Sequence, residues 1–191
     1  MIDWSEVHLS NYESAVFGMF SWRTAAKKLF MSAKVLEPHV LEMWESYRAA
    51  SKGDGELKPD YHQGVYFMLI AYAIENILKA MIVRRFNYEL KKSFRENKKF
   101  PSLLKDHDLM ALCKTAGVSV NLEEEDLLRR LDRSSVWYGR YPAPLDYKEL
   151  SGVEQFTNGD EYSVSWFGGN DVEKINALFK ELFSFIGESN T

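Results

Sequence analysis

The sequence predicts a mainly α-helical protein: a single domain over residues 1–191, built as an up-and-down helical bundle with a small β-hairpin inserted near 150–167. Apolar residues recur every three or four positions along most of the chain, which is the spacing of helices that bury one face. Only one stretch, in the inserted segment, alternates apolar and polar residues in twos. The composition, 46% hydrophobic and 27% charged, is typical of a chain that folds around one core.

The N-terminal part contains two helical patterns. Residues 1–12 are expected to form an irregular lead-in, and a helical pattern then runs over 12–35. Pro38 is expected to end or kink this helix, because proline has no N–H to donate and its ring clashes with the preceding turn. A second pattern follows over 40–47, and 51–56 is a polar loop with two glycines.

The next helix, over 60–86, is the most apolar and opens at a plausible N-cap, Asp60. It is apolar almost all round, as expected for the central helix of a bundle. Its stretch 65–83 has the length of a membrane span but contains Glu75 and Lys79. Each charge at mid-bilayer costs about 2.5–3.5 kcal/mol. The sequence therefore favours a buried helix, with no membrane as a partner.

Two more helices are expected before residue 139. A charged connector over 91–99 leads to a short helix over 103–115, which Gly117 ends. Asn121 then caps a helix whose inner stripe continues to Tyr138.

The pattern changes after a break at 139–144. Residues 153–156 and 162–166 alternate in twos around Asn158-Gly159, which is a strong signal for a β-hairpin. A last helix with regular apolar spacing follows over 172–186.

Composition excludes several classes of function. The net charge of −4 and the pI near 5.7 argue against a general nucleic-acid binder, although a local basic pocket would suit a nucleotide or a short RNA end. A single cysteine, Cys113, allows no internal disulfide, and the start of the chain resembles no signal peptide, so a cytoplasmic location is expected. The histidines lack zinc-ligand spacing, and no phosphate-binding glycine loop occurs. Neither a metal nor a cofactor is therefore predicted.

Three local sequences remain as candidates for function: 73–80, which contains Glu75 and Lys79; 106–109, which reads Asp-His-Asp-Leu; and 131–142, which ends Trp-Tyr-Gly-Arg-Tyr-Pro. Each has an ordinary structural explanation. The first suits a helix ion pair, the second a helix cap beside a solvated imidazole, and the third a helix stop.

In this order, the three sequences resemble the HEPN family, in which a Glu-x-x-x-Lys-Ala helix precedes a His-Asp-Leu helix start and an Arg-Tyr-Pro segment. The resemblance covers about residues 60–144, and 22–36 fits the family's first helix. It implies a helical bundle that forms a homodimer and binds a nucleotide or RNA. It also implies a role in a toxin–antitoxin or phage-defence system, with a nucleotidyltransferase-type partner.

The chain departs from the family's ribonucleases, which carry an Arg followed four to six residues later by a His. His107 is the last histidine, and it precedes both Arg133 and Arg140. No catalytic residue is therefore predicted, and the resemblance is to the branch that binds nucleotides or partners a nucleotidyltransferase.

We expect Lys79, His107 and Arg140 to converge near one end of the bundle and hold a phosphate, since Arg supplies a bidentate fork and Lys a point charge. Tyr138 and Tyr141 are expected to stack a base.

Glu75 and Asp108 are assigned supporting roles. In the competing structural interpretation, Arg140 pairs with Glu75 or Asp108 and joins the helix ends.

Two alternatives to a nucleotide- or RNA-binding module stay open. One is a metal-independent ribonuclease that uses His107 as base and Arg140 as phosphate anchor. The other is a protein–protein interaction module whose exposed aromatic surface includes Trp137 and Trp166.

Overall fold

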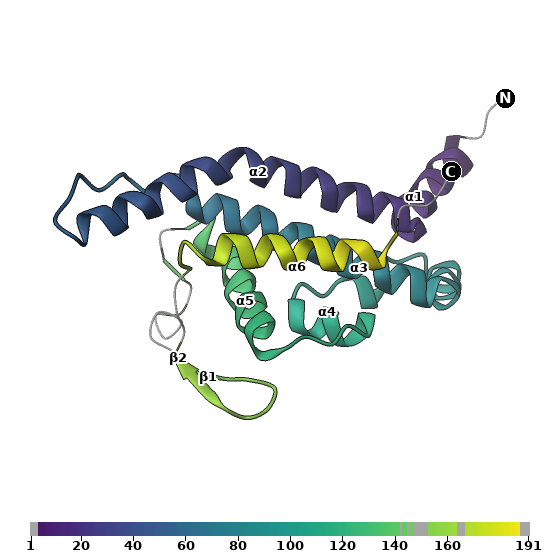
Figure 1. The fold of residues 1–191 in the computed structure, drawn as a ribbon. Coiled ribbons are helices and arrows are strands. Elements are labelled where there is room, and N and C mark those ends of the chain that lie inside the picture. The colour runs from purple at the N-terminus through teal and green to yellow at the C-terminus, as the bar shows by residue number, and fades with distance from the viewer. Residues whose placement is uncertain (1–3, 142, 145, 147–152, 164–166, 188–191) are drawn as a thin grey trace.

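The computed structural model describes residues 4–141, 143–144, 146, 153–163 and 167–187. Within them the chain is mainly α, as predicted, and it has six α-helices. Three long helices, α2, α3 and α6, lie lengthwise side by side, and the shorter α4 and α5 cover one flank of α3 (Figure 1).

The N-terminal third differs from its predicted form. The expected irregular lead-in is helical from its first described residue, in α1 (Trp4–Phe17). A break at Gly18 separates it from α2 (Met19–Ala50). A Cβ at Gly18 would lie 2.3 Å from the carbonyl oxygen of Ser14, so the tight junction requires glycine.

Pro38 was expected to end or kink the helix, but it does not end it, because α2 continues through Pro38 to Ala50. Proline removes one backbone hydrogen bond, and its neighbours Ala33, Val40 and Met43 are all buried. Packing against α3 therefore offsets the lost bond.

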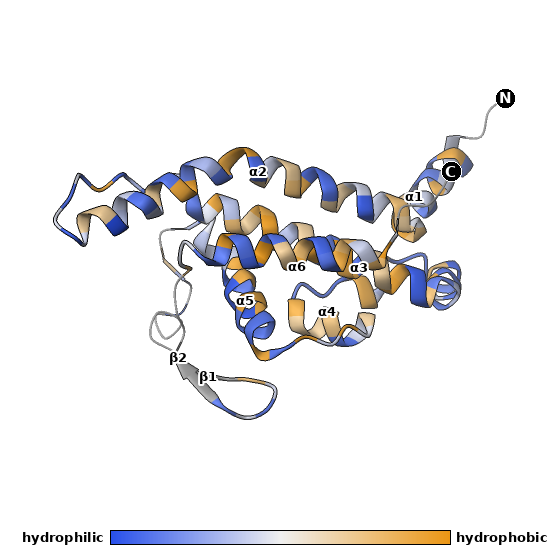
Figure 2. Ribbon diagram, in the orientation of Figure 1, coloured by the Kyte–Doolittle hydropathy of each residue, from blue (hydrophilic) through white to orange (hydrophobic). Residues whose placement is uncertain are grey.

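The central helix is α3 (Gln63–Asn97), whose apolar residues form the middle of the core (Figure 2). By length and composition it could cross a membrane, but 67% of its most apolar window is buried inside the fold. Non-helical dihedrals at Phe86 (φ −116°, ψ 26°) mark a kink at the predicted helix end. The chain then continues as helix to Asn97, so the predicted connector over 91–99 is helical in most of its length. Residues 87–97 are called the α3 arm below.

Short elements follow on one flank of α3. A 3-10 turn, η1 (Ser102–Leu104), precedes α4 (Leu109–Ala116), so the helix predicted from residue 103 begins later. A capping box at Asn121 starts α5 (Leu122–Arg133), and the chain then widens into a single π-helical turn, η2 (Ser134–Tyr138). Such turns occur frequently at functional sites.

The C-terminal part contains two short strands and a helix. β1 (Val153–Gln155) pairs antiparallel with β2 (Glu161–Ser163) around a turn in which Gly159 has φ 90°. Positions 150–152 and 164–166 of the predicted hairpin lie outside the described residues. The last helix, α6 (Asp171–Phe185), stacks the ring of Phe179 on that of Phe30 in α2, with centroids 3.8 Å apart.

Candidate functional site

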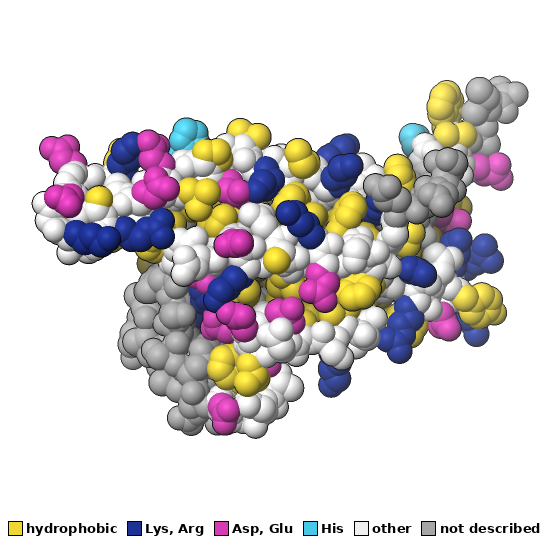
Figure 3. Space-filling view, viewed as in Figure 1, with side chains coloured by type: hydrophobic (Ala, Val, Ile, Leu, Met, Phe, Trp, Pro, Cys, Tyr) yellow, Lys and Arg dark blue, Asp and Glu magenta, His cyan; other side chains and the backbone are white. Residues whose placement is uncertain are grey.

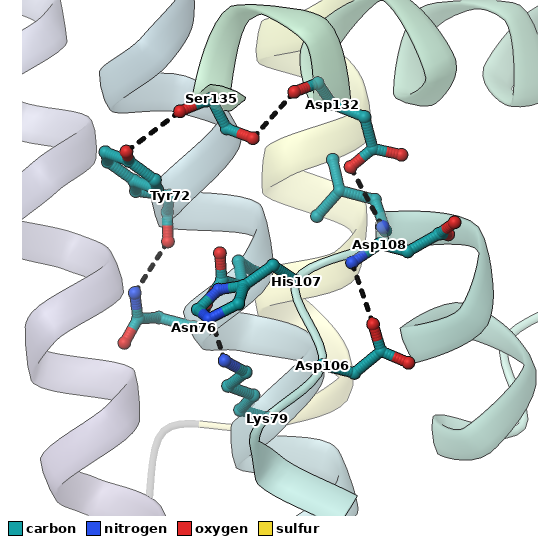
Figure 4. A network of polar contacts seen from close by, with 10 residues as sticks. Tyr72, Asn76, Lys79, Asp106, His107, Asp108, Asp132 and Ser135 are labelled. Atoms are coloured by element: carbon teal, nitrogen blue, oxygen red, sulfur yellow. Dashed lines mark hydrogen bonds and ion pairs between the residues drawn. The ribbon is translucent and has the colours of Figure 1, made fainter. Parts of the chain in front are cut away.

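One face of the apolar helix α3 is polar. Tyr72, Glu75, Asn76 and Lys79 follow one another at spacings of three, one and three residues, which places them on the same side of the helix. This polar face lies opposite the loop before α4 and the turn η2, and Figure 4 shows the resulting network.

The centre of the network is the carboxylate of Glu75. Its Oε1 accepts a hydrogen bond from Nζ of Lys79 at 2.6 Å, and the same oxygen lies 3.0 Å from Nδ1 of His107. Because a carboxylate can only accept, the imidazole proton on this side belongs to Nδ1. The structure therefore brings together two predicted ligand residues, Lys79 and His107, through a predicted supporting residue.

Lys79 and His107 differ sharply in exposure. The side chain of Lys79 is 3% exposed, whereas that of His107 is 72% exposed. The ring of Trp22 in α2 lies over Lys79, with its centroid 5.9 Å from Nζ. Moving a buried ammonium away from its carboxylate would leave a charge uncompensated, so Lys79 supports Glu75 instead of meeting a ligand.

Two aspartates shape the loop that carries His107. Asp106 accepts a hydrogen bond from the backbone N–H of Asp108 at 3.0 Å. Asp108 caps α4 by accepting from the N–H of Ala111 at 2.8 Å. The predicted supporting residue Asp108 therefore fixes the loop through a helix cap.

Asp132 in α5 was not singled out from the sequence, yet it joins this loop to the network. Its Oδ1 accepts from the N–H of Leu109 at 3.0 Å. Burial, together with the nearby charges of Asp108 and Glu75, raises the pKa of the Asp132 carboxyl to about 8. The sequence did contain an indication that Asp132 lies near the core, because it directly follows Leu131, which belongs to the inner apolar stripe of this helix.

A chain of hydrogen bonds ties η2 to α3. Ser135 donates its hydroxyl to the carbonyl of Asp132 at 2.7 Å, and Tyr72 donates its hydroxyl to the carbonyl of Ser135 at 3.0 Å. Asn76 in turn donates to the carbonyl of Tyr72 at 2.7 Å. Neither Tyr72 nor Asn76 was among the predicted site residues.

The guanidinium of Arg140 is exposed and lies over the ring of Tyr72, with Cζ 5.3 Å from the ring centroid. Among the residues that the structure describes, it forms no ion pair with Glu75 or Asp108, the two partners of the structural interpretation. Tyr141 beside it is 55% exposed.

Tyr138 lies elsewhere on α3. Its hydroxyl accepts from Nε2 of Gln63 at 2.7 Å and is 3.5 Å from Oδ2 of Asp60. Burial raises the pKa of this hydroxyl above its ordinary value. Gln63 precedes Lys79 by 16 residues, which is about 24 Å along a helix. The predicted set is therefore distributed along α3 and does not form a single pocket.

A close approach of two backbones holds this segment on α3. A Cβ added to Gly64 would lie 2.7 Å from the carbonyl oxygen of Tyr138, and one added to Gly139 would lie 2.6 Å from Cβ of Met68. Glycine at both positions lets the end of η2 press against the start of α3.

No family model, curated protein or solved structure matches this chain. Within the described part of the chain, no group of three or more His, Cys, Asp or Glu side chains is placed to hold a metal ion. The candidate site is therefore taken to be the network around Glu75 together with the neighbouring Arg140.

Proposed function

We propose that the chain is a HEPN-like helical binding module that recognises a phosphate of a nucleotide or RNA end through His107 and Arg140. The observation that carries this proposal is the arrangement of His107, whose Nδ1 faces the buried Glu75 while most of its ring lies in solvent. Burying a carboxylate costs desolvation free energy, and carboxylates that orient an imidazole are typical of histidines that bind a ligand.

Chemistry supports a phosphate as the ligand. An imidazolium can donate Nδ1–H to Glu75 and Nε2–H to a phosphate oxygen at the same time. Arg140 contacts Tyr72, and Tyr72 precedes Glu75 by three residues, about 4.5 Å along the helix. The guanidinium and the imidazole therefore contact residues that lie about one turn apart on the same face of α3. Tyr141, exposed beside Arg140, is suited to stack a base.

The wider role follows from the resemblance to HEPN proteins. It is a homodimeric, cytoplasmic module of a toxin–antitoxin or defence system, paired with a nucleotidyltransferase-type protein. The mainly α architecture and the order of the three local sequences along the chain support this role.

A second candidate is a metal-independent ribonuclease, which the contact between Glu75 and His107 favours. A carboxylate that fixes the Nδ1–H tautomer leaves Nε2 able to take a proton from a ribose 2′-hydroxyl. Arg140 would then stabilise the charge on the attacked phosphate.

Calorimetric titration with nucleoside monophosphates tests the binding proposal. His107→Ala and Arg140→Ala should each weaken binding at least tenfold without unfolding the protein. The matched controls are His39→Ala, an exposed histidine on α2, and Arg85→Ala, an exposed arginine whose Cζ lies 5.2 Å from the ring of Phe86. Equal affinity in all four variants would reject the site.

The same proteins separate binding from catalysis. Incubation with RNA should leave the strand intact if the chain is a binding module. Cleavage by the wild type that disappears in His107→Ala would establish the ribonuclease instead.

A further inference from the structure

The α3 arm has a basic face of its own. Tyr88, Lys91, Lys92 and Arg95 lie at spacings of three, one and three residues, so they share one side of the helix. These four side chains, together with Asn87 and Glu96, line a surface hollow of about 490 Å³.

Positive charge is concentrated around this face. Residues 84–99 contain seven basic and two acidic side chains, although the whole chain has a net charge of −4. Within the described chain, Lys91, Lys92 and Arg95 form no ion pair, whereas Arg129 and Arg130 in α5 pair with acidic residues of their own helix. Figure 3 shows Lys and Arg side chains gathered at the end of the molecule where the arm lies.

The opposite side of the arm is anchored to the fold. Leu90 and Phe94 are buried, and the Phe94 ring packs against the rings of Tyr12 and Phe17 in α1. Asn87 donates its side-chain amide to the carbonyl of Phe17 at 2.9 Å. Because the other side of the arm packs against the fold, the basic face points toward solvent.

We propose that this face binds single-stranded nucleic acid, with Lys91, Lys92 and Arg95 contacting phosphates and Tyr88 stacking a base. The Tyr88 side chain is 76% exposed and is one helical turn from both lysines. Cations beside an exposed aromatic ring are the two parts that single-strand binders combine. This surface is separate from the proposed site, since Arg95 follows Glu75 by 20 residues, about 30 Å along a helix.

Other anionic partners fit this face less well. A helix that binds a membrane surface needs an exposed apolar face, but Leu90 and Phe94 of the arm are buried, and the Phe94 ring packs against α1. Long duplex nucleic acid requires an extended positive surface, which conflicts with the net charge of −4.

Fluorescence anisotropy with labelled oligouridylate and oligothymidylate tests the proposal, using strands of roughly 12 nucleotides, within the site sizes of single-strand binders. The variant Lys91→Gln/Lys92→Gln/Arg95→Gln should bind both at least tenfold more weakly. Its slope of log affinity against log salt should fall by about 2, because each single-strand phosphate contact contributes about 0.7. The matched control, Lys27→Gln/Lys28→Gln/Lys180→Gln, removes the same charge from exposed positions on α2 and α6 and should bind like wild type.

The tyrosine offers a second test that does not change the charge. Tyr88→Ala should weaken binding at least about fivefold, the lower end of the cost of losing one stacked base. Tyr88→Phe should retain it. The matched control is Tyr61→Ala, since Tyr61 is also 76% exposed.

Equal losses in the two triple variants would overturn the proposal, because attraction would then depend on net charge alone. Undiminished binding in Tyr88→Ala would also overturn it, as would equally tight binding of the wild type to phosphatidylserine vesicles or to polyglutamate. The proposed site is scored separately by mononucleotide binding, which the triple variant of the arm should leave unchanged.

Discussion

The carboxylate of Glu75 lies 3.0 Å from Nδ1 of His107 and joins the buried centre of α3 to an exposed imidazole. The same oxygen carries the ammonium of Lys79 at 2.6 Å. One buried carboxylate thus contacts two basic side chains, of which Lys79 is buried and His107 is exposed. Removing the carboxylate should therefore affect the two side chains differently.

Glu75→Gln should destabilise the fold by about 3–5 kcal/mol, because it leaves the Lys79 ammonium buried without a carboxylate. Chemical denaturation followed by circular dichroism measures the loss. The double variant Glu75→Leu/Lys79→Met should recover most of the stability, since replacing a whole buried pair by apolar side chains is often neutral. A single variant as stable as the wild type would contradict the burial of Lys79.

Asp132 should make stability depend on pH. Its pKa of about 8 lies above the unfolded value of 3.8, so between these values the folded state binds more protons than the unfolded state. The free energy of unfolding contributed by Asp132 is therefore fully present below pH 3.8 and is lost as the pH rises to 8.

Asp132→Asn should remove this dependence, while its amide oxygen can still accept from Leu109. The wild type should lose at least about 1.4 kcal/mol more than the variant between pH 5 and pH 8, the equivalent of one pKa unit. Asp54→Asn in the exposed loop before α3 is the control, and its free energy of unfolding should depend on pH as that of the wild type does. Parallel curves for the wild type and Asp132→Asn would show that Asp132 is ionised in the fold.

Gly64→Ala and Gly139→Ala should each lower the free energy of unfolding by about 1–3 kcal/mol, because the new methyl group overlaps backbone or side chain in a packed contact. Gly168→Ala is the matched control, since its Cβ would lie 3.8 Å from its nearest neighbour, a carboxylate oxygen of Asp171. Thermal unfolding followed by circular dichroism compares the three. Similar melting temperatures would mean that η2 does not press on α3.

Two substitutions of Tyr72 should separate its two contacts. Tyr72→Phe loses the hydrogen bond to the Ser135 carbonyl, a loss of about 1 kcal/mol of stability, and keeps the ring under Arg140. Tyr72→Leu loses the ring as well and should weaken nucleotide binding by moving Arg140. Calorimetric titration of both variants measures the difference, and equal affinities would exclude Tyr72 as the support of Arg140.

Much of the helical architecture could be predicted, because apolar spacing reports burial directly. The misplaced elements have few buried positions. In α1 only Val16 and Phe17 are buried, and the α3 arm buries only Leu90 and Phe94, so neither segment has a readable stripe. The expectation for Pro38 failed for a different reason. The helix around Pro38 is stabilised by packing against distant residues, which the local sequence does not show.

The candidate site could be predicted only in part. Glu75 and Lys79 are four residues apart on a helix, so their ion pair follows from spacing. The contact of Glu75 with His107 spans 32 residues, and that of Asp132 with Leu109 spans 23. Such pairings depend on how α4 and α5 pack on α3, and one-dimensional patterns do not carry that information.

Imidazole ¹H–¹⁵N spectra recorded during titration with a nucleoside monophosphate test the proposed function most directly. The ring signals of His107 should shift saturably in the wild type, while those of His39 stay in place, and the shift should disappear in Arg140→Ala. A His107 ring that does not respond to nucleotide, or that responds equally without Arg140, would contradict phosphate recognition by this pair.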